Sequence, residues 1–483
     1  MSDFDDIDKN LVAADSLFLN LSNYKEITST DFMTEEQREV VERFFGGFRR
    51  SDDGSVLRDR FLRIWQAMSP IYHTFREELE REGLAYEGQM FRNVVERFDP
   101  SRLTADTYAF VGFNVLSAVE QRLFDLVAEN GKARFYWDYD FYYYHNPVAE
   151  AGSFIRQNID HFGCEWGHSS VSDEDSPFDN LRRLPRIDVV SAPTNNAQAS
   201  FAHDWIKQNL TIPEQESAVV LADEKLIMPL LHALPMDDIS DINVTMGLPM
   251  TETTVYPILR KLIDPDIVSD AAGDDDGTPL VWLQHLADEI DAKGLEMKKL
   301  DHRLQEEEEA LYRAHLAVNS IICLVEEGTL TASRRLLTRL LMTILRRTTI
   351  PFHGEPARGL QVMGVLETRG LDFRHLLLLS ANEGLIPKSP SEISFIPFSL
   401  RKAFGLTTIE RQTAVYAYYF YRMIGRAEQV TLVYNNGTDG MNQQEPSRFI
   451  TQLEVEFGGE IRHFNLLGTG TLASADEQTI VVE

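Results

Sequence analysis

The densest run of basic side chains in the sequence consists of arginines that lie close together near residue 340. A guanidinium group can pair with a phosphate through two hydrogen bonds, so this run could contact the backbone of DNA. A solvated surface that balances the acidic residues nearby would show the same composition, and both interpretations stay open. The DNA-binding candidates are Arg334, Arg335, Arg339, Arg346, Arg347 and Arg358.

Sequence motifs of well-known catalytic sites are absent. There is no phosphate-binding G-x-x-x-x-G-K-[ST] loop, no G-x-S-x-G elbow, no H-E-x-x-H pair and no calcium-binding loop. The histidines His145, His161 and His168 show no ligand spacing, and two cysteines, Cys164 and Cys323, are too few for a four-thiolate zinc site or an iron–sulfur cluster. We therefore expect no catalytic residue, no metal and no cofactor in this chain.

The composition limits the class of protein. The chain has 483 residues, with 46 basic and 76 acidic side chains and a formal net charge of -30, which argues against a protein that coats nucleic acid by bulk charge. The 43% of apolar residues excludes a disordered chain. No apolar run reaches membrane-spanning length, and the acidic start lacks the order of a signal peptide. We expect a cytoplasmic protein with no membrane partner.

Apolar periodicity predicts two blocks in which strands alternate with helices, the pattern of a parallel sheet. The first block has strands at 108–113 and 134–137 around one helix, and helices fill 34–95, with a new helix beginning at Pro70. Residues 279–347 are predicted to be helical nearly throughout. The second block has predicted strands at 187–190, 217–222, 360–366, 375–380 and 430–434 and helices at 196–209, 226–234 and 410–427.

Two stretches in the second block carry an unusual order of charged residues. Leu360–Pro387 reads LQVMGVLETRGLDFRHLLLLSANEGLIP and resembles motif V of the superfamily 1 DNA helicases, in which a strand leads into T-x-H-x-x-K-G-L-E-F. Glu410-Arg411, Tyr418–Arg422 and Gly425–Ala427 precede a strand and resemble motif VI of that family. Lys293–Met297 matches K-G-L-E-F better by letters but lies in a helical pattern, so we reject it.

The similarity is closer to the helicase-like half of AddB-type recombination nucleases and of Bacteroidetes PD-(D/E)XK nuclease family proteins, which carry L-E-T-R-x-L-D-F. Asn243–Pro249 also fits that family, as does Val111–Phe113 followed by Ser117 and Glu120. The sequence departs from active helicases because Gly364 and Leu366 replace the threonine and histidine of motif V. The resemblance therefore implies an inactivated nucleotide site, in which Asp5 and Asp6 resemble the acidic pair of motif II that holds magnesium. The remnants of this site are Asp5, Asp6, Arg369, Asp372, Arg411 and Arg426.

The resemblance also implies a fold and a division into domains. We expect two RecA-like α/β domains with parallel sheets, the first of them incomplete, each with a helical insertion. The expected ranges are 1–33 and 96–165 for the rest of the first domain, 34–95 for its insertion, 186–270 and 354–483 for the second domain, and 271–353 for its insertion. The phosphate loop and the nuclease domain of the family would lie outside this chain.

The function implied by this resemblance is a catalytically degraded scaffold in a bacterial double-strand-break repair nuclease, which binds DNA or a partner helicase–nuclease subunit. One alternative is an active ATP-dependent DNA helicase whose phosphate loop lies upstream of this chain, and only that alternative requires ATP and magnesium. A second alternative is a protein-interaction module that does not bind DNA.

Overall fold

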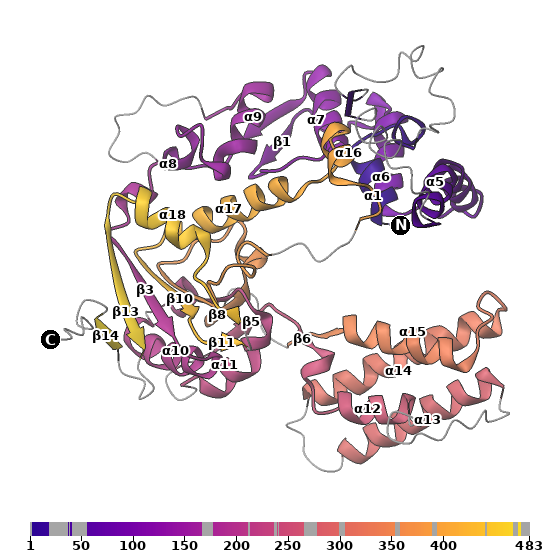
Figure 1. Cartoon of the computed structure of the whole chain (residues 1–483). Helices are drawn as coiled ribbons and strands as arrows, with labels where there is room; N and C mark the ends of the chain where they lie inside the picture. The colour runs from indigo at the N-terminus through magenta and orange to yellow at the C-terminus, as the bar shows by residue number, and fades with distance from the viewer. Residues whose placement is uncertain are drawn as a thin grey trace. The chain divides into compact units, whose positions relative to one another are not determined.

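The computed structural model divides the chain into two compact units (Figure 1). Unit 1 contains Met1–Leu184 and Ile386–Arg426, and unit 2 contains Pro185–Leu385 and Ala427–Glu483. The expected ranges place all of 354–483 in the second domain, whereas the segment 386–426 belongs to unit 1. The structure describes residues 2–18, 37, 39–40, 56–166, 177–210, 213–235, 239, 241–264, 278–298, 305–352, 358–388, 394–439, 442–466 and 472–474.

Unit 2 contains a sheet of eight described strands, in which seven neighbouring strands are parallel and β14 is antiparallel to β13. This arrangement confirms the α/β class with a parallel sheet. The predicted strands of the second block are also confirmed. In spatial order the strands are β14 (Leu472–Ser474), β13 (Glu460–Leu466), β3 (Arg186–Ala192), β10 (Gln429–Asn435), β9 (His375–Leu379), β4 (Ser217–Leu221), β8 (Leu360–Gly364) and β5 (Ile242–Val244).

The central strands of this sheet are buried on both faces, as parallel strands in α/β proteins are. Every residue of β4 and β8 is buried, and Val219 of β4 pairs with Leu377 on one side and Val362 on the other. Helix α10 (Asn195–Asn209) packs Ala202 and Ile206 into the same core. The shorter helices are α11 (Ile227–Ala233) and α18 (Arg448–Glu456).

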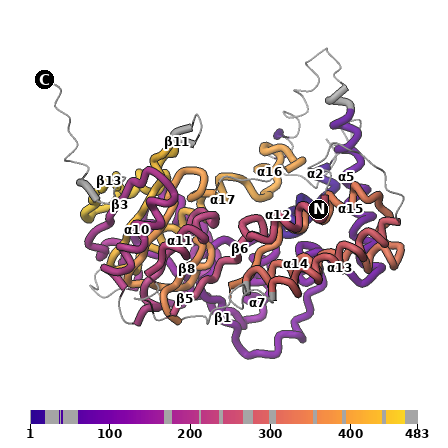
Figure 2. The backbone as a smooth tube through the Cα atoms, turned by 90° about the horizontal axis from the view of Figure 1, so that it is seen from below, coloured from indigo at the N-terminus to yellow at the C-terminus, as the bar shows by residue number. Residues whose placement is uncertain are grey.

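A helical insertion lies between β5 and β8 of this sheet. It is bounded by β6 (Leu248–Pro249) and β7 (Thr349–Ile350), two short strands that form a separate antiparallel pair. The described residues between 279 and 347 are helical nearly throughout, as predicted. Lys293–Met297 lies within a helix, which agrees with its rejection as a motif. The helices are α12 (Tyr256–Ile263), α13 (Pro279–Lys298), α14 (Gln305–Glu326) and α15 (Arg334–Arg347), and the last three lie side by side in Figures 1 and 2.

The amino-terminal part of unit 1 is helical. Phe4 and Leu17 pack with Trp65 and Tyr72 in one apolar cluster. The expectation that a new helix begins at Pro70 is wrong, because α5 continues through this proline. Burial of Trp65 before the proline and of Tyr72 after it favours one continuous helix despite the missing N–H. The helices are α1 (Ser2–Lys9), α2 (Ala14–Leu17), α5 (Val56–Arg81), α6 (Glu87–Glu96) and α16 (Phe398–Ala403).

Two parallel strands, β1 (Tyr108–Val111) and β2 (Ala133–Tyr136), form a separate small sheet in unit 1. One face is covered, because Phe110 and Phe135 pack against Phe124 of the connecting helix. On the other face Val111 is 62% exposed, whereas its pairing partner Tyr136 packs edge-on against Trp166. The helices around this sheet are α7 (Ala118–Glu129), α8 (Phe141–Tyr144), α9 (Ser153–Phe162) and α17 (Ile409–Gly425).

Candidate functional site

Helix α17 carries the predicted motif VI arginines, and two arginines near its end bind one carboxylate. The side chain of Arg426 donates to Asp138 with an Nη2–Oδ1 distance of 2.9 Å, and Arg422 donates to the other carboxylate oxygen. Asp138 lies two residues after the end of strand β2. The hydroxyl of Tyr418 donates to the backbone carbonyl of Asp138 at 3.0 Å. Thus Arg426, a predicted remnant of the nucleotide site, has an anionic partner within unit 1.

The tyrosines around this ion pair are held in their neutral form. Burial raises the pKa of Tyr418, and the Asp138 carboxylate raises it further. Tyr143, which lies edge-on to Tyr418, is buried, and burial likewise raises its pKa. Both phenols stay protonated, and two guanidinium groups neutralise Asp138. The contact of Asp138 with Arg422 and Arg426 is therefore a structural ion pair.

Arg411, at the start of α17, has a different environment. Its Nη2 donates to the backbone carbonyl of Leu116 at 2.5 Å, and its guanidinium lies 5.4 Å from the ring centre of Phe154. Burial lowers the pKa of Arg411, although the carboxylates of Asp6 and Glu120 act in the opposite direction. The loop that supplies Leu116 leads into α7, where Ser117 and Glu120 form a capping box.

The acidic pair that resembles motif II lies inside helix α1. Asp5 accepts a hydrogen bond from the backbone N–H of Gly88 at 2.7 Å and pairs with Lys9. Asp6 accepts from the hydroxyl of Thr407 at 2.7 Å and from the guanidinium of Arg401. Both carboxylates therefore connect helices of unit 1. Among the residues that the structure describes, no group of three or more His, Cys, Asp or Glu side chains could hold a metal ion, and His168 lies outside them.

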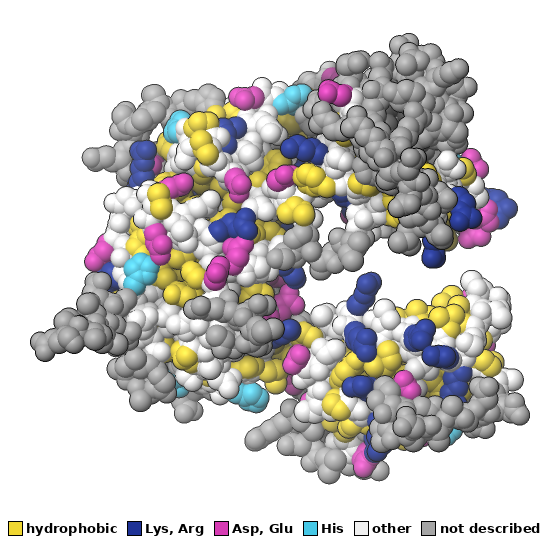
Figure 3. Space-filling view, in the orientation of Figure 1, with side chains coloured by type: hydrophobic (Ala, Val, Ile, Leu, Met, Phe, Trp, Pro, Cys, Tyr) yellow, Lys and Arg dark blue, Asp and Glu magenta, His cyan; other side chains and the backbone are white. Residues whose placement is uncertain are grey.

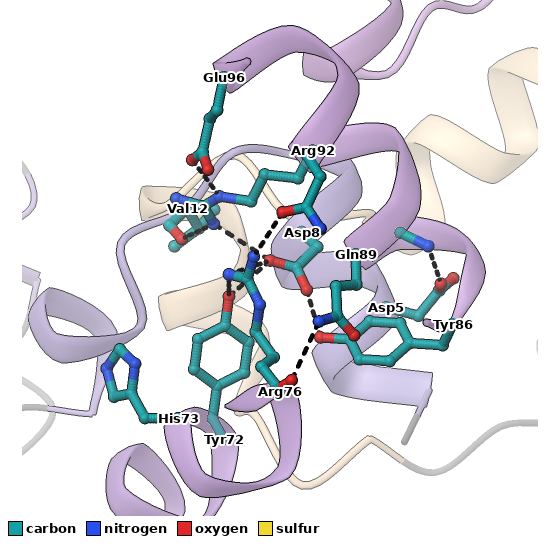
Figure 4. Close-up of polar contacts among 12 residues, drawn as sticks. Asp5, Asp8, Val12, Tyr72, His73, Arg76, Tyr86, Gln89, Arg92 and Glu96 are labelled. Carbon is teal, nitrogen blue, oxygen red and sulfur yellow. Dashed lines mark hydrogen bonds and ion pairs between the residues drawn. The ribbon is translucent and has the colours of Figure 1, made fainter. Parts of the chain in front are cut away.

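A neighbouring aspartate, which the sequence analysis did not select, is the most completely buried acid in this part of unit 1. Asp8 is 0% exposed and accepts hydrogen bonds from the hydroxyls of Tyr72 and Tyr86 (Figure 4). Arg76 and Arg92 lie 3.3 Å and 3.2 Å from the same carboxylate. We call these five residues the Asp8 cluster. Asp8 lies one turn after the apolar Phe4, on the apolar side of its helix. A carboxylate in that position was the sequence feature that could have indicated a buried, paired acid.

Burial and hydrogen bonding change the acid–base properties of the Asp8 cluster. Burial raises the pKa of Tyr72 to about 12, and its hydrogen bond to Asp8 adds to the rise. The pKa of Tyr86 is raised for the same two reasons. Arg76 also donates to the hydroxyl of Tyr72 at 2.6 Å, so the cluster joins α1, α5 and α6 through a continuous set of hydrogen bonds.

Arg369 and Asp372, the remnants predicted from motif V, lie in unit 2, on the exposed loop between β8 and β9. The loop contains a 3-10 turn at Leu366–Thr368, and Arg369 donates to the carbonyl of Leu366 at 2.9 Å. Gly370 has φ of 73°, the left-handed region that favours glycine. The four other predicted remnants belong to unit 1.

A buried polar cluster at the carboxyl ends of β9 and β10 was also missed. The Gln198 side chain accepts a hydrogen bond from the backbone N–H of Ser380 at 2.8 Å. Asn382 donates to the carbonyl of Asn435 at 2.7 Å and accepts from its N–H at 2.9 Å. This edge is where ligands bind in many open α/β sheets, but here the side-chain amides of Gln198 and Asn382 bind backbone groups and hold the strand ends together.

The predicted DNA-binding arginines lie mostly on one helix, α15, which contains no acidic residue. Arg335, Arg339, Arg346 and Arg347 are exposed, and none of them forms an ion pair with a described carboxylate. Arg334 lies 5.3 Å from the ring centre of Trp282, and Arg358 lies outside the helix. Figure 3 shows dark-blue side chains gathered over this helical insertion.

Comparison with known proteins adds no family to this description. No model of a known protein family matches the chain, and no curated protein is significantly similar to it. Among the helices that the structure describes, none has the length and apolar character needed to cross a membrane.

Proposed function

We propose that this chain is the helicase-like region of a DNA-repair nuclease assembly and acts as a scaffold that binds DNA or a partner subunit without hydrolysing ATP. The observation that carries the proposal is the pairing of Arg422 and Arg426 with Asp138. An arginine that stabilises phosphoryl transfer must meet the charge that develops on the transferred phosphate. Arg426 instead pairs with the carboxylate of Asp138, a protein side chain of the same unit.

The remaining remnants of the nucleotide site support the same proposal. Asp6, which would hold magnesium in an active helicase, binds Arg401 and Thr407. Arg411 binds a backbone carbonyl. Each of these side chains contacts another element of unit 1. This agrees with a nucleotide site that no longer binds nucleotide and whose side chains now stabilise the fold.

The sheets support a RecA-like assignment of the two units. The parallel sheet of unit 2, with strands joined through helices, is the architecture that such a domain requires. The β1–β2 sheet of unit 1 has two parallel strands and one partly exposed face, whereas all-parallel sheets in α/β proteins have both faces covered. We infer that this sheet corresponds to part of an incomplete first domain.

An unwinding assay separates the scaffold from a motor. The intact protein is mixed with a partly single-stranded DNA duplex, with and without ATP and magnesium, and strand separation is followed by fluorescence. We expect the same slow strand separation in both conditions. ATP-dependent unwinding that disappears in Arg426→Ala, but persists in the exposed-surface control Arg81→Ala, would favour the active-helicase alternative and exclude the scaffold.

A further inference from the structure

Helix α15 presents a stripe of arginines that no described carboxylate neutralises. With about 100° between successive residues of an α-helix, Arg335, Arg339 and Arg346 project within a narrow sector of its surface. All three side chains are exposed, and Arg346 makes one long hydrogen bond, of 3.4 Å, to the hydroxyl of Tyr256. The opposite side of α15 is fixed in the helical insertion, where Leu337, Leu341 and Leu345 are buried.

A second stripe, next to the arginines, is apolar. Leu336 is 54% exposed and Leu340 is 37% exposed, and the two lie one turn apart on the same side of the helix. Arg347 projects in the same direction as the two leucines, so a basic residue ends this stripe at the carboxyl end of the helix. A helix that already buries one apolar face therefore exposes a further apolar stripe beside a basic one, which is typical of a surface that another molecule covers.

We propose that this exposed face of α15 docks an acidic amphipathic helix of a partner protein. Carboxylates on one stripe of the partner pair with Arg335, Arg339 and Arg346, and apolar side chains on its adjacent stripe cover Leu336 and Leu340. Recognition of an amphipathic helix through charge and apolar contacts together is a recurring mode of protein association. The inference names the class of partner for the proposed scaffold and rests on that proposed function.

The leucines distinguish this partner from DNA. Phosphates can pair with the arginines, but they offer nothing to cover Leu336 and Leu340, whereas a helix of complementary pattern satisfies both stripes. The net charge of -30 also disfavours the long-range attraction of DNA more than that of a short acidic segment. A helix of this length spans about 21 Å, so one partner helix matches it and forms a small interface.

The test uses a fluorescent synthetic peptide of about eighteen residues, long enough to form a helix, with glutamates on one stripe and leucines on the next. A scrambled peptide of the same composition is the control for charge alone. Binding to the intact chain is measured by fluorescence anisotropy for the wild type, for R335Q/R339Q and for L336S/L340S. Leu295→Ser, which changes a 63% exposed leucine on α13, is the matched control variant.

We expect each double variant, and the scrambled peptide, to bind at least about tenfold more weakly than the matched pair, and Leu295→Ser to bind normally. Equal binding of the scrambled peptide would overturn the proposal, as would an unchanged affinity of L336S/L340S. Binding of a labelled DNA duplex that depends on the arginines but not on the leucines, with no binding of the peptide, would assign the face to DNA. ATP-dependent unwinding leaves this result untouched, so the two proposals fail separately.

Discussion

At the scale of single residues, the carboxylate of Asp8 has the largest structural role in unit 1. Four side chains converge on it, three from helices α5 and α6 and the fourth from Tyr86 just before α6, and it has no exposure to water. A buried charge is tolerated when it is paired and its lone pairs are satisfied, and both conditions hold here. Removing the charge would leave Arg76 without its carboxylate partner and Arg92 with Glu96 alone, in a partly buried environment.

We therefore expect Asp8→Asn to lower the free energy of unfolding of unit 1 by about 3 kcal/mol or more. The free energy is measured by urea titration with tryptophan fluorescence. Asp15→Asn removes a carboxylate that is 74% exposed and serves as the control, with an expected loss below about 1 kcal/mol. Similar losses in the two variants would show that the Asp8 cluster has no special role.

The tyrosines of unit 1 predict sensitivity to alkaline pH. A tyrosine whose pKa is raised on folding binds its proton more tightly in the folded state, so its stabilising effect is complete below about pH 10, the pKa of the unfolded chain. That effect is lost as the pH rises through the folded value, which is about 12 for Tyr72 and for Tyr139. We expect stability to fall between these pH values and the fall to be smaller in Tyr72→Phe than in the exposed control Tyr312→Phe.

At the scale of elements, helix α17 is fastened by the ion pair at its carboxyl end. The Arg422 side chain is 10% exposed and that of Asp138 is 22% exposed, so the pair is screened less than a surface pair. The helix also buries Phe420 and Ile424. This apolar packing fixes the positions of the arginines independently of their charge. The ion pair and the apolar face together hold α17 in unit 1.

A double-mutant cycle measures this fastening. We expect Asp138→Ala and Arg422→Ala to be coupled by about 1–3 kcal/mol in unfolding free energy, because each mutation removes the partner of the other. The exposed pair Arg97–Glu80, with side chains 68% and 50% exposed, should give a coupling below about 1 kcal/mol. A coupling for Asp138 and Arg422 as small as that of the surface pair would contradict a structural role.

The elements themselves were largely predictable from the sequence, since unbroken apolar runs such as Ser217–Leu221 and His375–Leu379 leave few alternatives to a buried strand. The break expected at Pro70 was wrong because tertiary burial on both sides outweighed a local preference. The Asp8 cluster and the Gln198–Ser380 contact were not predicted, because their partners lie far apart in sequence and local periodicity contains no information on such pairs. The predicted nucleotide-site residues could be located only after the fold was known.

At the scale of the whole molecule, the excess of acidic residues governs the response to salt. With a net charge of -30, the acidic side chains repel one another in the compact state, and added salt screens that repulsion. We expect the melting temperature to rise by a few degrees between about 10 mM and about 150 mM sodium chloride, at a pH near 7. A melting temperature that falls over this range would mean that ion pairs outweigh the net repulsion.

We propose that the chain has a helicase-like fold without ATP hydrolysis, since Asp138 pairs with Arg426, the arginine predicted to be a remnant of the nucleotide site. The most direct measurement is the steady-state rate of ATP hydrolysis by the intact protein with magnesium, with and without single-stranded DNA. We predict a rate at the background of the assay in both conditions, unchanged in Arg426→Ala. A rate that DNA stimulates about tenfold or more, and that Arg426→Ala abolishes, would show that the chain is an active ATPase and not a scaffold.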